Sequence, residues 1–328
     1  MKITKRITIA GMMALSLLIG CGSGRNTGSA ADSSEVGVKE PEGKDIAFDR
    51  DSAYRYVARQ VEFGPRVPNT EAHRRAGDWL AGELERHGAK VIQQKMKLRA
   101  FDGTILDSRN ILGQYNPEAS ERVLLLAHWD CRPWADEDSD ESKRRQPVDG
   151  ANDGASGVGV LLEIARQLGI EAPGKGVDIL FVDAEDWGTD GDEDSWALGA
   201  QEFVANPPVK NYAPKEAILL DMVGGKDAVF HREYFSDRSA PGLNSTLWEI
   251  AAELGHSASF PNRTGGAITD DHQRLIEGGI PAVDIIEFNP SAGGFNSRWH
   301  TASDNMEGIS AETLGKVGQV VMKYLRGR

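Results

Sequence analysis

Cysteine is almost absent from this chain of 328 residues, which contains two. Cys21 directly follows an apolar leader, so Cys131 is the only cysteine in the rest of the chain. With no second thiol beside it, Cys131 cannot form an internal disulfide. We therefore expect a fold without disulfides, in which Cys131 is either a packed thiol or a reactive one.

Positive charge is also scarce. The chain has 37 Lys and Arg against 50 Asp and Glu, a net charge of -13. Proteins that bind nucleic acids need clustered basic residues to displace counterions from phosphates, so no nucleic-acid partner is expected. A hydrophobic content of 40% over this length can bury one large core, without any indication of repeats. Nothing in the sequence indicates an oligomeric state.

The apolar stretch of the leader is too short to span a membrane. Lys2, Lys5 and Arg6 precede apolar residues 7–19, whereas a spanning helix needs roughly 20 residues. This pattern is typical of an export signal. Its ending, Leu18-Ile19-Gly20-Cys21, resembles a bacterial lipoprotein signal. That resemblance implies that residues 1–20 are removed and that a lipid on Cys21 anchors the exported protein to a bacterial membrane. An ordinary secretory signal is the alternative.

Composition divides the remaining chain into two parts. Residues 21–45 are rich in Gly, Ser, Asp and Glu and have few large apolar side chains. Such a segment cannot offset the entropy lost on ordering, so a flexible tether is expected. Residues 46–328 are predicted to form a single catalytic domain.

Short apolar runs alternate with helical patterns throughout this domain. The alternation predicts an α/β fold, a three-layer sandwich whose mostly parallel, mixed sheet carries helices on both faces. Strands are expected around residues 91–92, 110–112, 123–126, 177–182, 217–220 and 280–283. Helices are expected over residues 50–62, 70–87, 155–169, 196–206, 242–255, 271–278 and 310–326.

Side chains suited to metal binding follow these predicted strands. His128 ends one strand, and Asp130 could orient its imidazole through the second ring nitrogen. Asp153 lies among the small residues of 150–157, which would let the backbone approach a bound ion closely. The alternative is that Asn152 or Asp153 only caps the following helix.

Further carboxylates and a second histidine repeat this arrangement. Glu185 and Asp186 follow a strand as neighbours, so one can hold a metal while the other serves as an acid or base. A solvated turn is the alternative for this pair. Asp221 ends another strand, and His300 follows the last one. Because the strand ends of an open α/β sheet share one crevice, these residues predict a common metal site and a zinc enzyme.

In their order, these residues resemble the zinc-dependent glutaminyl-peptide cyclotransferases, which share a fold with the zinc aminopeptidases. The resemblance extends from about Asp51 to the C-terminus. It rests on His128-x-Asp130, Gly150-Ala-Asn-Asp153, Glu185-Asp186, Asp221, Asp270-Asp271-His272 and Trp299-His300-Thr301 with Asp304-Asn305.

The resemblance implies a role for each of these residues. Asp153, Asp186 and His300 would hold one zinc, and Glu185 would be the general acid and base. Asp221 and Asp270 would form an acidic cluster around the reacting group, and Trp299 would be a wall of the glutamine pocket. The implied reaction converts the N-terminal glutamine of peptides to pyroglutamate and releases ammonia. A helix N-cap is the alternative for Asp270, and a core position is the alternative for Trp299.

Three departures from the animal cyclases and two competing functions accompany the resemblance. One departure is that Cys131 lacks the partner cysteine expected beside the metal. Asp186 stands where a glutamate is expected, and Asp284 where a histidine is expected. A two-zinc aminopeptidase could use the same residues, with His128 and Asp221 at the second metal and Asp153 as the bridge. The third possibility is a binding domain that kept the fold without catalysis, against which intact candidate ligands argue.

Two acidic segments remain. Residues 136–141 lie between His128 and Asp153 and are expected to overhang the site as a mobile loop or to be a solvated insertion. Residues 190–194 allow a calcium hypothesis but lack the ligand spacing of an EF-hand loop.

Overall fold

The computed structural model describes residues 47–290 and 294–327. A six-stranded sheet in the order β1-β2-β4-β3-β5-β6 forms the centre of this part of the chain. Strands β4, β3, β5 and β6 are parallel, and β2 and β1 extend one edge in antiparallel fashion. The strands are β1 (Lys90–Arg99), β2 (Ile105–Tyr115), β3 (Arg122–His128), β4 (Gly176–Val182), β5 (Glu216–Asp221) and β6 (Ala282–Ile286).

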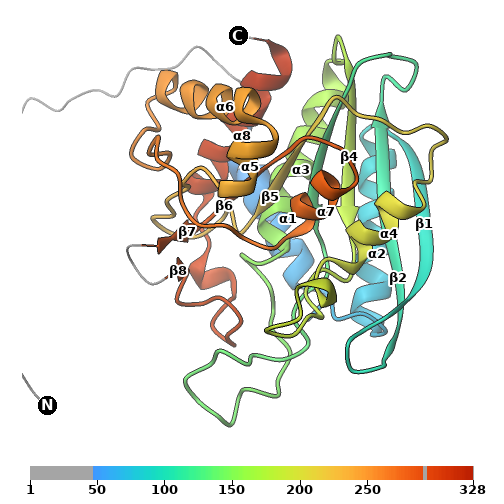
Figure 1. Ribbon diagram of the computed structural model, residues 1–328, viewed down its shortest axis with the longest axis vertical. Coiled ribbons are helices and arrows are strands. Elements are labelled where there is room, and N and C mark those ends of the chain that lie inside the picture. The colour runs from blue at the N-terminus through green and yellow to red at the C-terminus, as the bar shows by residue number, and fades with distance from the viewer. Residues whose placement is uncertain (1–46, 291–293, 328) are drawn as a thin grey trace, which may run out of the picture. The chain divides into compact units, whose positions relative to one another are not determined.

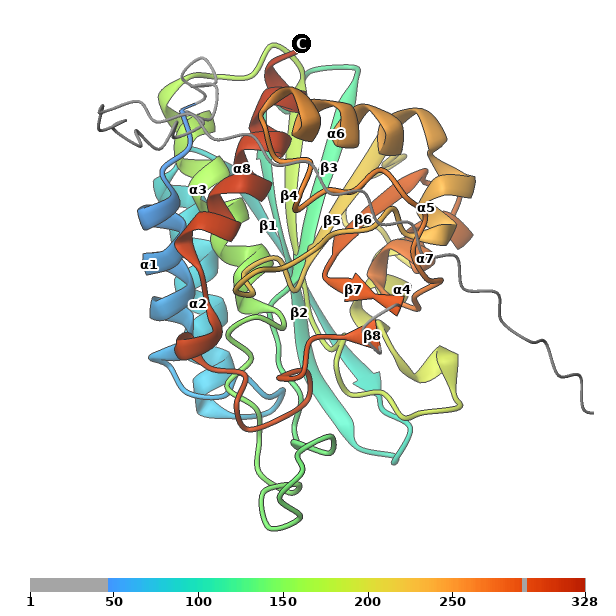
Figure 2. The same ribbon diagram turned by 90° about the vertical axis from the view of Figure 1, so that its left-hand side faces the viewer.

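Helices cover both faces of the sheet, as Figures 1 and 2 show. One face packs against α1 (Arg50–Val61), α2 (Glu71–Arg86), α3 (Ala155–Ile170), α6 (Pro241–Glu253) and α8 (Ala311–Arg326). The other face packs against α4 (Leu198–Ala205) and α7 (Asp271–Glu277). Side chains alternate between the two cores along each strand, so Leu125 faces the first and Leu124 the second. The predicted three-layer sandwich is confirmed.

Every strand and helix predicted from the sequence is present at its expected place. The pattern missed the short helix α5 (Tyr234–Ser239) and the small hairpin of β7 (Phe288–Asn289) with β8 (Gly294–Phe295). Both lie beside the carboxyl end of β6. The predicted leader, the tether and Cys21 lie outside the described residues.

Glycines at the start of α3 allow elements of the protein to approach each other closely. A Cβ on Gly157 would come within 2.0 Å of the carbonyl oxygen of Leu220 on β5. At Gly154, which has φ +88°, it would come within 2.7 Å of the carbonyl oxygen of Asp130. The two glycines therefore allow the start of α3 to lie close to the backbone at the ends of the neighbouring strands. Cys131 is buried in the same region, where its sulfur accepts a hydrogen bond from the backbone N–H of Arg66.

Among the described residues, no helix has the length and apolar character needed to cross a membrane.

Candidate active site and metal centre

A pocket of about 270 Å³ opens at the carboxyl ends of the parallel strands. It is the place where ligands bind in open α/β sheets. The lining residues come from widely separated parts of the chain and include Asp153, Glu185, Trp196, Asp221, Ile268, Asp270, Ile286, Phe288, Phe295, Trp299 and His300. The sequence therefore correctly predicted that these strand ends and loops meet at one site.

Asp153, Asp186 and His300 form the first candidate metal group. Their ligand atoms lie within 4.8 Å of one another, and all three residues are buried. His300 Nε2 lies 3.1 Å from Asp186 Oδ1 and 3.6 Å from Asp153 Oδ2. We call this set the Asp186 group. One imidazole and two carboxylates are a ligand set that zinc accepts in catalytic sites, where a fourth position stays open.

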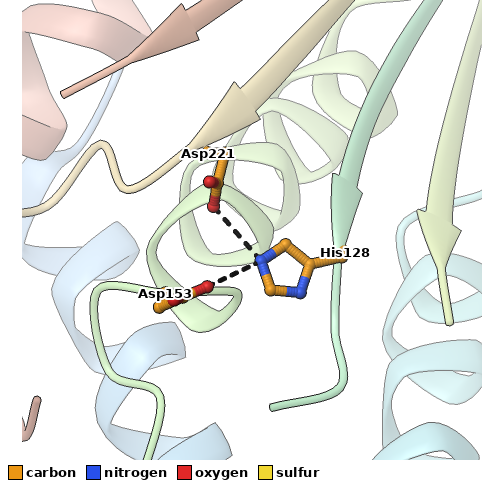
Figure 3. A group of neighbouring side chains, drawn as sticks. All are labelled: His128, Asp153 and Asp221. Atoms are coloured by element: carbon orange, nitrogen blue, oxygen red, sulfur yellow. Dashed lines mark hydrogen bonds and ion pairs between the residues drawn. The ribbon is translucent and has the colours of Figure 1, made fainter. Parts of the chain in front are cut away.

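His128, Asp153 and Asp221 form the second candidate group, shown in Figure 3. His128 Nε2 lies between the two carboxylates, 3.0 Å from Asp153 Oδ1 and 3.2 Å from Asp221 Oδ1. Burial lowers the pKa of His128, but Asp130, Asp153 and Asp221 outweigh it and raise that pKa well above its usual range. We call this set the His128 group. Asp153 belongs to both groups.

Unpaired oxygen atoms distinguish the two groups. Both carboxylate oxygens of Asp186 are buried and accept no hydrogen bond from the described residues. Burial and the nearby Asp153 carboxylate raise the pKa of Asp186 to about 6. In the His128 group, by contrast, Asp221 accepts a hydrogen bond from His128. Asp186 has only the ion-pair contact with His300 at 3.1 Å, so its buried carboxylate is short of hydrogen bonds and the Asp186 group fits a zinc ion.

Glu185 lies next to this group and lines the pocket. Burial raises its pKa well above its usual range; the charge of His128 opposes this shift, whereas Asp270 and Asp186 add to it. A carboxyl group with a raised pKa can both accept and return a proton near neutral pH. The side chains of Glu185 and Asp186 thus take separate positions, as the sequence predicted.

Asp130 fixes the turn that presents this pair. Its two carboxylate oxygens accept the backbone N–H groups of Glu185 and Asp186, at 3.1 and 3.3 Å. Asp130 Oδ1 also lies 3.5 Å from His128 Nδ1, an ion-pair distance that is too long for a good hydrogen bond. Asp130 therefore supports the acidic turn more directly than it orients His128.

Asp270 belongs to a buried acidic cluster behind the pocket. It caps α7 by accepting the N–H of Asp271, and its other oxygen has no partner among the described residues. Burial raises its pKa well above the usual range, and Asp221 and Asp271 add to the shift. Asp284 on β6 lies deeper, 3.6 Å from His272 Nδ1. Asp270 thus combines the capping role with a place in the pocket lining.

Three site residues stand beside or in strained backbone. Ala184, Met222 and His300 have positive φ values of 55°, 47° and 52°. Such angles are uncommon outside glycine and persist only where the surrounding structure enforces them. The turns change the direction of the chain directly before Glu185, directly after Asp221 and at His300 itself. His300 therefore reaches the site from a strained turn, not from the end of a sheet strand.

Sequence reasoning missed two buried arginines that hold the site's loops. Arg66 donates to the carbonyl oxygens of Trp129, Asp149 and Gly150, which fixes the loop before Asp153. Arg132 donates to the carbonyl oxygens of Asp186 and Gly188. Neither arginine lies in a recognisable motif, so no sequence signal could have identified them.

The family model described as peptidase family M28 matches residues 110–325 of this chain. The chain belongs to peptidase family M28. A solved Zn-dependent exopeptidase from Parabacteroides distasonis is 56% identical, covering 86% of this chain and 99% of its own with a TM-score of 0.84. A solved Tannerella forsythia glutaminyl cyclase is 51% identical, covering 86% and 99% with a TM-score of 0.84.

A curated relative is more distant. Aminopeptidase YwaD of Bacillus subtilis is 28% identical over 267 residues, which cover 78% of this chain. The chain spans about half of that relative's length, 52%. The similarity to glutaminyl cyclases predicted from the sequence is confirmed by the solved structures.

Proposed function

We propose that this protein is a zinc-dependent glutaminyl-peptide cyclotransferase with one zinc, held by Asp153, Asp186 and His300. The observation that carries the proposal is the pair of unpartnered, buried oxygens of Asp186, next to Glu185 and the pocket. Among the described residues, the carboxylates of the His128 group have no such unpartnered oxygens, although Nδ1 of His128 lacks a partner. The high identity to a glutaminyl cyclase over nearly its whole length supports the same function.

The proposed substrates are peptides and proteins that begin with glutamine. In the pocket, the flat ring of Trp299 can pack on the methylene groups of the glutamine side chain, with Phe295 and Ile268 nearby. Asp221 and Asp270 face the same space and can accept hydrogen bonds from the substrate's nitrogen atoms. When bound, zinc would act as a Lewis acid that polarises the γ-carbonyl group of the glutamine.

Glu185 would move the proton. It first takes a proton from the α-amine while that nitrogen forms a bond to the γ-carbonyl carbon. It then returns the proton to the side-chain amide nitrogen, whose bond to the same carbon breaks to release ammonia. One carboxylate is sufficient because the two transfers follow one another. The raised pKa of Glu185 suits this exchange.

The deciding experiment incubates the zinc-loaded protein with a peptide beginning Gln-Phe and follows the products by mass spectrometry. Loss of one ammonia from the intact peptide, faster than in an enzyme-free control and stopped by chelation, supports the cyclotransferase. Release of the first residue rejects it.

A two-zinc aminopeptidase is the second candidate, because the ligand atoms of the His128 group also lie within 4.8 Å of one another. It requires a metal between His128 and Asp221 with Asp153 as the bridge. Metal analysis distinguishes the candidates: the cyclotransferase is expected to retain one zinc per chain after dialysis, and the aminopeptidase two.

We also propose that the protein is exported and anchored through a lipid on Cys21. The basic start, the apolar residues 7–19 and the ending Leu18-Ile19-Gly20-Cys21 support this. Expression of Cys21→Ser followed by membrane fractionation tests it. The variant is expected to leave the membrane fraction, and unchanged membrane association would reject lipidation at this residue.

A further inference from the structure

The imidazole of His300 packs against aromatic rings and has a carboxylate near each ring nitrogen. Its ring stacks on Trp299 at a centroid distance of 3.7 Å and is nearly parallel to Trp196 at 6.0 Å. Nε2 faces the Asp186 group, whereas Nδ1 lies 3.8 Å from Asp136 Oδ1, an ion-pair distance that is too long for a hydrogen bond. A metal-binding histidine needs a partner for its second nitrogen, because that partner sets the tautomer and the ring orientation. Asp136 is the carboxylate that faces this nitrogen.

Arg132 holds the carboxylate of Asp136 in place. Its Nε and a terminal nitrogen donate to the two oxygens of Asp136, at 3.0 and 2.5 Å. The other terminal nitrogen donates to the carbonyl oxygens of Asp186 and Gly188, at 2.9 and 3.0 Å. A planar guanidinium bound in this forked way has little freedom. Arg132 therefore couples the carboxylate beside His300 to the turn that carries Asp186.

The two residues after Asp136 hold the backbone of the His300 turn. The N–H of Glu137 donates to the carbonyl oxygen of His300 at 3.1 Å. The carboxylate of Asp138 accepts the N–H of Ala302 at 3.0 Å. Asp138 is 5% exposed although it lies in a strongly acidic segment. Residues 136–138 thus pack along residues 300–302, which helps to maintain the left-handed backbone of His300.

These contacts exclude a purely solvated role for the first half of the acidic segment. We propose that Asp136, held by Arg132, is a positioning residue that orients the imidazole of His300 for zinc binding through Nε2. This inference rests on the zinc site of the proposed function and names a further residue that the site needs. It assigns Asp136 no contact with substrate or zinc.

The test compares zinc affinity in purified Asp136→Ala, Asp136→Asn and Asp140→Asn proteins by competition with a chromophoric chelator. Asp140 is the matched control, because its exposed carboxylate lies on the same segment and accepts hydrogen bonds from Ser142. The visible absorption spectrum of each cobalt-substituted protein reports the ligand geometry. The thermal unfolding midpoint of each metal-free protein reports stability separately.

Asp136→Ala is expected to bind zinc about 10–100-fold more weakly, the usual effect of losing such a support. Asp136→Asn is expected to lose less, because its amide oxygen still presents a partial negative charge to Nδ1. Both should shift the cobalt spectrum, and Asp140→Asn should match wild type. The metal-free midpoint of Asp136→Ala should fall, because buried Arg132 loses its carboxylate partner, so the zinc affinity and cobalt spectrum of the folded protein carry the test.

Wild-type zinc affinity in both Asp136 variants overturns the inference. An equal loss of zinc affinity in Asp140→Asn also overturns it, because that loss would indicate a general effect of charge. If Asp136→Ala does not fold, Asp136→Asn decides: an unchanged affinity and spectrum overturn the inference. Zinc affinity is measured without substrate. A wild-type protein that fails to cyclise glutamine while the affinity difference persists would reject the proposed function and leave this inference standing.

Discussion

The Asp186 group and the His128 group contain the same kinds of side chain, share Asp153 and lie in one crevice. The two groups differ in the contacts that compensate their buried charges. His128 bridges Asp153 and Asp221 with short contacts, so its group is compensated by its own members. Asp186 has His300 at ion-pair distance, yet both of its oxygens accept no hydrogen bond from the described part of the chain. The inventory of ligands does not separate these two groups, whereas the unpaired oxygens of Asp186 do. Asp271 and Asp284, behind the pocket, also have two unpaired oxygens each among the described residues.

The strongest test of this difference removes the imidazole from each group in turn. His300→Ala is expected to lose the zinc and all turnover above background. His128→Ala is expected to retain the zinc, because the proposed single zinc is held by the Asp186 group. Metal content after dialysis, measured by mass spectrometry of the elements, checks both. Zinc lost equally from the two variants would show that the groups form one two-metal centre.

Glu185→Gln sharpens the comparison by separating metal binding from proton transfer. The variant is expected to retain its zinc, while turnover falls about 10²–10⁴-fold, the usual contribution of a general acid and base. Turnover of a glutamine-initiated peptide and zinc content are measured on the same preparation. Retained turnover would contradict the assignment of Glu185.

Zinc should also stabilise the fold through the Asp186 group alone. At free zinc about a hundredfold above the dissociation constant, the free energy of unfolding should rise by about 2.7 kcal/mol. Chelation should remove this gain in wild type and in His128→Ala, and should change nothing in His300→Ala. Chemical unfolding with and without chelator measures this gain in the free energy of unfolding. A chelator effect that persists in His300→Ala would place the zinc elsewhere.

The smallest expected effect concerns the packing of the His128 group. Gly154→Ala forces a left-handed backbone on alanine and brings its Cβ within 2.7 Å of the Asp130 carbonyl oxygen and 3.0 Å of His128 Cε1. The left-handed backbone should lower the free energy of unfolding by about 1–2 kcal/mol, and the close contact should lower it further. Gly103→Ala is the matched control, because Gly103 has φ +85° and nothing within 4 Å of the added atom. Zinc content should not change in either variant.

Much of the fold follows from sequence periodicity because the elements are long and strongly patterned. The β4 residues 177–182 are apolar except for Asp178, which pairs with Arg122, and they lie between two helical cores, which is the pattern of a central parallel strand. Helix α5 escaped prediction because its six residues are too few to show a period, and its stability comes from the cap that Glu233 provides. The hairpin of β7 and β8 is too short to alternate.

The candidate site was predictable where a functional residue follows a patterned element. Asp153, Glu185, Asp186 and Asp221 do so, and they converge as expected. Arg132 and Asp136 were not predictable, because their importance lies in contacts with residues 186, 188 and 300, far away along the chain. The acidic segment was expected to be a mobile or solvated loop. Instead, residues 136–138 pack along residues 300–302.

The distribution of the Asp186 group along the chain has a consequence for folding. Asp153 precedes α3, Asp186 follows β4, and His300 lies beyond the last strand of the sheet. These ligands can meet only after long-range contacts have closed nearly half of the chain, a slow class of event. Zinc capture should therefore be a late step in refolding. A nascent chain that ends at β6 would already contain every strand of the central sheet and still be unable to bind the metal.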